Sequence, residues 1–329
     1  MRYTFPRGGI HPPTGKEFTC ARATEDLAVP QLLYLPLGQH LGAPSQPIVE
    51  KGQHVLMGEK IAEAAGKVSV PVHASVSGVV KEFTTISLPN GKRSLTVVLE
   101  NDGEDEPAPP LARPHGEPEQ VPREEIVALM RETGLVGMGG AAFPTHVKYD
   151  LPPDVKIDTV ILNGVECEPF LTCDHRLMLE DPEDIILGLR LMVRASGAKR
   201  GIVGVEENKP DAIAVLEEDM RPYPLLDVKP LVLKYPQGEE RLLIKAITGR
   251  DVPQGALPSA VGVVVSNVAT ASALGRAYRT GMPLIERVVS VTGPGVDKHG
   301  NWRVRLGTPV KDLLDAALWR GTSTVLAGG

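Results

Sequence analysis

Four glycines fall within the seven residues Gly134-Leu-Val-Gly-Met-Gly-Gly140, and Ala141-Ala-Phe-Pro-Thr-His-Val-Lys148 follows directly. Glycine lets backbone amides approach an anion closely, and the start of a helix adds partial positive charge. Lys148 could neutralise a phosphate from one turn further on. The segment is neither GxGxxG after a strand nor GxxxxGKS, so the Rossmann and Walker mechanisms do not transfer. It indicates either a cradle for a phosphate or flavin, or a turn between two helices that needs positive φ.

Three polar turns each follow a predicted strand. They are Asn163-Gly-Val-Glu-Cys-Glu-Pro169, Tyr235-Pro-Gln-Gly-Glu-Glu240 and Ser266-Asn-Val-Ala-Thr270. Their carboxylates, amides and hydroxyls could hydrogen-bond a ribityl chain or a ribose, although each turn alone could be a capped surface turn. Because ligands bind beyond the carboxyl ends of the strands of an open parallel sheet, we expect these turns and the glycine-rich segment to meet at one site.

Strands that alternate with helices are expected to position these turns. Strands are predicted at 160–162, 202–205, 231–233 and 261–265, and helices from Pro122 to Gly134, from Pro144, from Asp181 to Gly197, over 209–220, after Gly238 and over 267–278. The Asp181-Pro-Glu-Asp184 run is a strong helix start. This alternation predicts a mainly parallel sheet covered by helices, over a domain of residues 122–282.

The residues on either side predict two further domains. Residues 1–105 give short strands with regularly spaced glycines, which resembles the flattened β-barrel of biotinyl and lipoyl carriers. No lysine occupies the stretch His73–Gly78 where a carrier would present one, so a structural barrel is favoured. The acidic, proline-rich residues 101–121 form a linker. Residues 283–329 predict two strands and a helix, a small third domain.

Composition narrows the class of protein. The 329 residues carry a formal net charge of −6 without a basic cluster, so nucleic acid is not an expected partner. No apolar run approaches the roughly 20 residues of a membrane-spanning helix, and the N-terminus lacks a signal peptide's apolar core. We therefore expect a soluble, cytoplasmic chain that could still dock on a membrane protein. Cys20, Cys167 and Cys173 form no CxxC pair, and no metal site is predicted.

The ordered motifs resemble the FMN- and NADH-binding 51 kDa subunit of respiratory complex I. That family carries GRGGAGFPTGxKW, NADESEPG, YxxGEE and NNVET in this order. The corresponding segments here are 137–149, 163–169, 235–240 and 266–270. The resemblance implies FMN and NAD(H) as cofactors and a central Rossmann-like α/β domain.

The N-terminal segments GGIHPPTGKEFT, LPLGQHLGAP and PVHASVSGVVKEF resemble the opening of the RnfC family. Its members belong to the membrane-bound Rnf complex, which couples NADH and ferredoxin to ion pumping. This resemblance implies a multidomain α/β protein with an N-terminal barrel-sandwich domain and a C-terminal β-grasp domain similar to soluble-ligand-binding domains. It also implies NADH:ferredoxin-type oxidoreductase activity, other Rnf subunits as partners, and a peripheral place on the cytoplasmic side of the membrane.

The resemblance assigns roles to individual residues. Gly137, Gly139, Gly140 and Lys148 would cradle the FMN phosphate and ribityl chain, and Phe143 would stack on a dinucleotide ring. Asn163, Glu166 and Glu168 would line the flavin, with Glu168 near the nicotinamide. Tyr235, Gly238, Glu239 and Glu240 would complete the pocket, and Ser266, Asn267 and Thr270 would hold the phosphate end. Glu168 and Glu240 are the candidate catalytic residues.

Several positions depart from the complex I pattern. Val165 replaces an aspartate, Met138 an arginine, and Ala142 and His146 replace glycines, while 249–258 lacks the basic, Phe-containing sequence that helps to hold NADH. Flavin binding is therefore a safer expectation than NADH affinity. RnfC proteins ordinarily continue into a region with two CxxCxxCxxxCP runs for 4Fe-4S clusters. This sequence ends before such a region, and we expect it to be truncated.

Two other functions fit part of the pattern. Cobalamin reductases of microcompartments share the flavin motifs, but they typically begin with the flavin domain. A docking or assembly module would use its barrel and β-grasp domains to bind proteins, and its glycine-rich segment would be a turn. Failure to bind FMN or NADH would favour that module.

Overall fold

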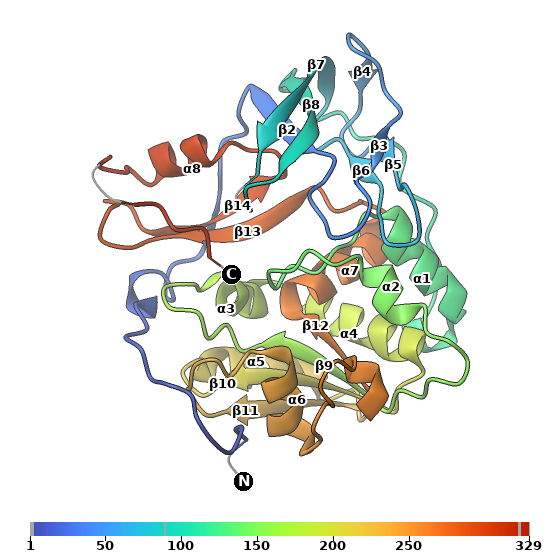
Figure 1. Ribbon diagram of the computed structural model, residues 1–329, viewed down its shortest axis with the longest axis vertical. Coiled ribbons are helices and arrows are strands. Elements are labelled where there is room, and N and C mark those ends of the chain that lie inside the picture. Colours follow the sequence, from blue (N-terminus) through green and yellow to red (C-terminus); the bar gives the residue numbers. More distant parts are fainter. Residues whose placement is uncertain (1–2, 89, 322–323, 329) are drawn as a thin grey trace.

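The computed structural model describes residues 3–88, 90–321 and 324–328. Figure 1 shows three parts: a small β-structure at the top, a further β-sheet with helical structure beside it in the middle, and a larger α/β unit at the bottom. No helix among these residues has both the length and the apolar character needed to cross a bilayer.

The top part is a pair of antiparallel sheets built from the first hundred residues. One sheet has the order β2-β8-β7-β4 and the other β3-β5-β6. A single apolar cluster fills the space between them, and it includes Leu33, Val55, Ile61 and Leu99. The strands are β2 (Leu32–Pro36), β3 (Gln46–Pro47), β4 (His54–Val55), β5 (Lys60–Glu63), β6 (Val72–His73), β7 (Gly78–Ser87) and β8 (Arg93–Asn101).

The α/β unit contains a parallel four-stranded sheet of order β11-β10-β9-β12. Its strands are β9 (Thr159–Gly164), β10 (Arg200–Glu206), β11 (Leu226–Leu231) and β12 (Val263–Asn267). The helices are α1 (Arg123–Glu132), α2 (Thr145–Tyr149), α3 (Cys173–Glu180), α4 (Pro182–Ser196), α5 (Pro210–Met220), α6 (Glu240–Thr248) and α7 (Val268–Thr280), with 3-10 turns at Pro118–Gln120 and Pro258–Val261.

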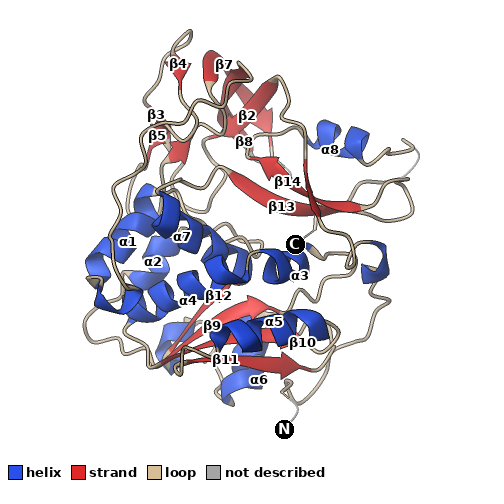
Figure 2. Ribbon diagram, turned by 180° about the vertical axis from the view of Figure 1, so that it is seen from behind, coloured by secondary structure: helices blue, strands red, loops and turns tan. Residues whose placement is uncertain are grey.

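Helices cover both faces of this sheet (Figure 2). Val160 and Leu162 of β9 pack with residues of α3, α4, α5 and α7 on one face. Ile161 of the same strand packs with Leu243 and Ile244 of α6 on the other. This burial on both faces explains why β9 has a continuous apolar run rather than an alternating one.

Two glycines set how closely α4 and α7 cross. A Cβ on Gly188 would lie 1.9 Å from the carbonyl oxygen of Ala271, and a Cβ on Gly275 would lie 2.1 Å from that of Asp184. The two helix backbones therefore touch directly. Since α7 begins at the carboxyl end of β12, this crossing fixes where the first turn of α7 lies.

The third part is a sheet of order β1-β14-β13, with β13 (Glu286–Val291), β14 (Gly300–Arg305) and α8 (Val310–Ala316). Its third strand, β1 (Thr24–Asp26), comes from the beginning of the chain and pairs in parallel with β14. Residues 24–26 were predicted to belong with the barrel, and their pairing with β14 was not foreseen. The β-grasp assignment and the domain limits at 105, 122 and 283 stay predictions.

One strand predicted for the α/β unit is displaced, and one of its helices was not predicted. The strand expected at 231–233 is found at Leu226–Leu231 instead. It lies at the sheet edge, where the polar residues Asp227 and Lys229 and also Pro230, which lacks an amide hydrogen, are tolerated and weaken the apolar signal. Helix α3 was not predicted, because its eight residues directly precede the stronger start of α4 at Pro182.

Candidate functional site

The glycine-rich segment forms the loop between α1 and α2, and it contacts the first turn of α7. The amide of Gly137 donates to the carbonyl oxygen of Phe143 at 2.9 Å, which closes the loop on itself. The amide of Met138 donates to Oγ1 of Thr270 at 3.0 Å. A Cβ on Gly139 would lie 3.3 Å from the Cβ of Asn267, so glycine allows this close approach. The loop thus lies against the junction where β12 ends and α7 begins.

Asn163 and Asn267 join the ends of the two central strands to the loop before α6. They are neighbours in register on β9 and β12. Nδ2 of Asn163 donates to the carbonyl oxygen of Gly238 at 2.8 Å, and Nδ2 of Asn267 donates to that of Asn163 at 3.4 Å. The side chain of Asn267 also caps α7 by accepting from the amide of Ala269. All four predicted segments therefore meet at one edge of the sheet.

A cavity of about 590 Å³ lies at this meeting point, within the size range of ligand pockets. Its walls combine apolar side chains, among them Leu41, Leu151 and Leu257, with polar groups from the strand ends. The predicted site residues that line it are Gly137, Gly139, Phe143, Lys148, Asn163, Gly238, Glu239, Glu240, Ser266, Asn267 and Thr270. Gly140 belongs to the loop but lines neither this cavity nor the next.

A second cavity of about 400 Å³ adjoins the first and shares Gly139, Asn163, Gly238, Glu239 and Asn267 with it. The predicted residues Glu166, Glu168 and Tyr235 line only this second space. The hydroxyl of Tyr235 donates to Oε1 of Glu168 at 3.3 Å. The two candidate catalytic carboxylates are consequently separated: Glu168 lines the second cavity and Glu240 the first.

Several predicted ligand groups already have partners within the chain. Nζ of Lys148 donates to the carbonyl oxygen of Val265 at 2.9 Å and lies 3.5 Å from Oε1 of Glu240. The carboxylate of Glu239 caps α6 by accepting from the amide of Leu242. Oγ of Ser266 pairs with the hydroxyl of Tyr149 at 3.1 Å. These contacts fix the side chains in place around the first cavity.

Glu166 has a capping role that the sequence did not reveal. Its carboxylate accepts from the amides of Asp174 at 2.7 Å and His175 at 3.3 Å, the first turn of α3. Glu166 has a φ of 47°, which turns the chain sharply enough for this contact. The carboxylate therefore orders α3 as well as lining the second cavity.

Asp174 is a further acidic group at this site, and sequence reasoning missed it together with α3. It accepts from Nδ2 of Asn267 at 2.6 Å. Burial, and then the neighbouring Glu166 carboxylate, raise the pKa of Asp174 to about 7, while Arg287 acts in the opposite direction. Burial also raises the pKa of the Cys173 thiol. The side chains of Glu166, Cys173 and Asp174 offer possible metal-ligand atoms within 4.8 Å of one another. The expectation that this chain has no metal site stays a prediction.

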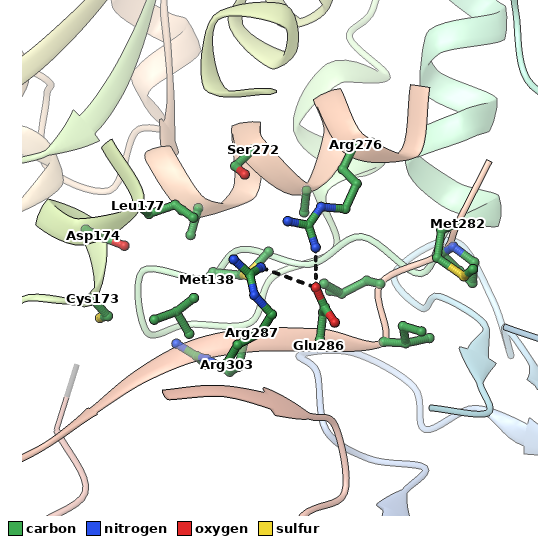
Figure 3. A pocket seen from close by; sticks show the side chains of 16 residues that line it. Met138, Cys173, Asp174, Leu177, Ser272, Arg276, Met282, Glu286, Arg287 and Arg303 are labelled. Atoms are coloured by element: carbon green, nitrogen blue, oxygen red, sulfur yellow. Dashed lines mark hydrogen bonds and ion pairs between the residues drawn. The ribbon is translucent and has the colours of Figure 1, made fainter. Parts of the chain in front are cut away.

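A smaller cavity of about 60 Å³ separates α7 from β13 (Figure 3). Figure 3 shows Arg276 and Arg303 beside the carboxylate of Glu286, which pairs with both. Met138 and Asp174 line this cavity as well. The Arg276–Glu286 ion pair thus attaches the three-stranded sheet to α7, and the Arg303–Glu286 pair joins β14 to β13 within that sheet.

The arrangement combines a close approach of the backbone at Gly139, apolar walls and polar strand ends, which are the kinds of surface that ligand pockets use. Lys148 offers a cation at the first cavity, and Glu168 with Tyr235 offers hydrogen-bond partners at the second.

Two family descriptions match separate parts of the chain. Residues 130–276 match the Nuo51 FMN-binding domain, and residues 3–104 match the RnfC barrel sandwich hybrid domain. The first range contains the glycine-rich loop and all three polar turns. The second contains the paired antiparallel sheets at the top of Figure 1.

Relatives are similar over nearly the whole chain. The C subunit of the Na+-translocating ferredoxin:NAD+ oxidoreductase complex of Acetobacterium woodii is 44% identical over 94% of this chain and 70% of its own length. The C subunit of the ion-translocating oxidoreductase complex of Rhodobacter capsulatus is 43% identical over 94% of this chain and 60% of its own. The crystal structure of an H2-reduced NAD+-reducing NiFe-hydrogenase matches with a TM-score of 0.55 and 25% identity, over 63% of this chain and 41% of that chain.

Proposed function

This chain belongs to the RnfC family, and we propose that it binds FMN in the first cavity and NAD(H) across the second. It is a redox subunit, and we assign it hydride transfer between NAD(H) and FMN. Electrons would then pass to 4Fe-4S clusters, for which residues 1–329 contain no CxxC pair. Other Rnf subunits would hold it at the cytoplasmic side of the membrane.

The observation that carries this proposal is the meeting of four distant segments. Gly137 and Gly139 of the loop border one cavity together with Asn163, Gly238 and Asn267, and direct hydrogen bonds or close contacts connect these segments. A turn without a ligand role would not need an open space of about 590 Å³ beside it. The matched FMN-binding domain family supports the choice of ligand.

In the proposed complex, the chain's own residues bind and orient. The amide of Gly139 and the ammonium of Lys148 favour the phosphate, and Asn163, Asn267 and Thr270 hold the polar chain of the nucleotide. Glu168 and Tyr235 orient the nicotinamide ribose from the second cavity. Bound FMN supplies the hydride acceptor, so no side chain needs to form a covalent intermediate.

The first experiment is a titration of FMN into the chain, followed by quenching of flavin fluorescence. We expect saturable binding with one FMN per chain, and weaker binding of riboflavin because it lacks the phosphate. Addition of NADH to the complex should bleach the flavin absorbance. If the chain quenches the fluorescence of neither FMN nor riboflavin, the proposal is refuted and the docking-module alternative is favoured.

The cobalamin reductase alternative has less support. The barrel at residues 3–104 and the similarity to the two C subunits over 94% of the chain both favour an Rnf protein. Reduction of a corrinoid by the FMN-loaded chain, at a rate matching its reduction of one-electron acceptors, would reverse this preference.

A further inference from the structure

Lys16 is a buried lysine whose ammonium is fully used by one loop of the site. It begins the 3-10 turn Lys16–Phe18 and is 7% exposed. Its Nζ donates to the carbonyl oxygens of Glu166 at 2.8 Å, Glu168 at 3.0 Å and Leu171 at 2.6 Å. An ammonium has three donors, and all three are directed at the loop that carries Glu168.

The residues beside Lys16 pack on the same loop. The amide of Phe170 donates to the carbonyl oxygen of Thr14 at 2.6 Å. A Cβ on Gly15 would lie 2.4 Å from the ring of Phe170, and Gly15 has a φ of 60°. Both the close contact and the left-handed backbone conformation therefore favour glycine at this position. The ring of Phe18 stacks on that of Phe170 at 6.2 Å between centroids.

The same N-terminal segment also holds the loop that carries Tyr235. The amide of Ile10 donates to the carbonyl oxygen of Tyr235 at 2.8 Å, and the amide of Tyr235 donates back to that of Ile10 at 2.9 Å. Oγ1 of Thr4 donates to Oε1 of Gln237 at 3.1 Å. One continuous segment thus supports both Glu168 and Tyr235, whose side chains meet at 3.3 Å in the second cavity.

The geometry points to residues 10–18, which we call the N-terminal arm, as a positioning element of the dinucleotide half of the site, with Lys16 as its principal positioning residue. The arm contacts the loops of the second cavity, and none of its residues lines the first. This inference rests on the proposed function, because it takes the second cavity as the place of NAD(H).

Removal of the ammonium would leave three carbonyl oxygens without their donor. Buried acceptors that lose a charged donor are costly, so the loop 166–171 should move to find other partners. Lys16 does not line the first cavity, which should keep its shape. The expected effect therefore falls on reaction with NADH and spares the binding of FMN.

The experiment compares Lys16→Met, Lys16→Arg and the exposed control Lys51→Met in the full chain. Hydrogen–deuterium exchange of the ligand-free chain reports on the loop, and stopped-flow reduction of the FMN-loaded chain by NADH reports on the site. For Lys16→Met we expect faster exchange at 167–172, FMN affinity within about twofold of the parent chain, and a second-order rate constant with NADH lower by about tenfold or more. Lys16→Arg should recover part of this rate, and Lys51→Met should keep all of it.

An unchanged rate constant and unchanged exchange in Lys16→Met would overturn the inference. Equal losses of FMN binding and NADH reduction would also overturn it, because they indicate a general structural role.

If Lys16→Met fails to fold, Ile10→Pro tests the arm instead, since it removes one donor to Tyr235 from an exposed position. It should slow reduction and keep FMN binding. A parent chain that binds no FMN refutes the proposed function, while the exchange measurement still tests the hold of Lys16 on the loop.

Discussion

Lys148 and Glu240 face each other at the wall of the first cavity, with Nζ 3.5 Å from Oε1 and a further hydrogen bond from Nζ to the carbonyl oxygen of Val265. Both side chains are more than one-third exposed, so the pair adds little to folding stability. The role of the pair is instead to hold the ammonium group of Lys148 at the cavity wall. A phosphate bound beside Lys148 would interact with this ammonium group together with, or in place of, the carboxylate of Glu240.

Lys148→Met should therefore weaken FMN binding by about tenfold, the effect of losing one charge-assisted hydrogen bond of roughly 1.5 kcal/mol. Fluorescence titration measures the change. Riboflavin provides the control, because it has no phosphate and should bind both proteins equally. Glu240→Gln should leave FMN binding equal or tighter, and a loss matching that of Lys148→Met would contradict this role for the lysine.

Glu168→Gln tests the second cavity. Glutamine can still accept the hydrogen bond from Tyr235, but the negative charge is removed. We expect reduction of bound FMN by NADH to slow by about tenfold, with FMN affinity within about twofold. Glu207→Gln, an exposed carboxylate that lines neither cavity, is the matched control. Equal reduction rates in all three proteins would remove Glu168 from the mechanism.

His73 predicts how stability depends on pH. It is 3% exposed, Nε2 has no hydrogen-bond partner among the described residues, and burial lowers its pKa to about 3. In the unfolded chain His73 becomes protonated as the pH falls through about 6.5, whereas in the folded chain it stays neutral until the pH approaches 3. This group therefore lowers stability as pH falls from about 6.5 toward 3, by about 1.4 kcal/mol per pH unit.

His73→Leu should remove that contribution. Denaturant unfolding at several pH values measures it: the stability of His73→Leu relative to the parent chain should rise as the pH falls through this window. His115→Leu, at an exposed position, should follow the parent chain. Parallel pH profiles for His73→Leu and the parent would show that the buried ring does not stay neutral.

Gly188→Ala tests the crossing of α4 and α7. Within a helix, alanine is favoured over glycine by about 1 kcal/mol. The new Cβ would, however, lie 1.9 Å from the carbonyl oxygen of Ala271, so the helices must separate. We expect a net destabilisation of about 2 kcal/mol or more, together with weaker FMN binding, because α7 carries Thr270. A more stable variant would contradict the direct contact between the two helix backbones.

Local signals predicted most of the α/β unit. Pro182 at the first position of α4, Gly197 in the left-handed conformation after it, and the apolar runs of β9, β10 and β12 are all encoded within a few residues. The edge strand β11 was misplaced because its residues alternate with polar ones. Strand β1 was missed because three polar residues form it only by pairing with β14.

For the candidate site, motif spacing predicted which segments meet, because parallel strands end at the same edge of a sheet. It could not predict which side chains the protein uses internally. Glu166 caps a helix that was not foreseen, and Lys16 acts on a loop that begins 150 residues away along the chain. A contact between residues as far apart as Lys16 and Glu166 leaves no periodic pattern in either segment.

The pairing of β1 with β14 also bears on how the molecule is made. Thr24 lies opposite Asn301, and Thr172 donates to the side chain of the same asparagine. During synthesis on the ribosome, β1 cannot pair with β14 until almost all of residues 1–305 have been made. The sheet β1-β14-β13 therefore forms late, and the second cavity, which Val289 and Ser290 of β13 help to line, is completed late in translation as well.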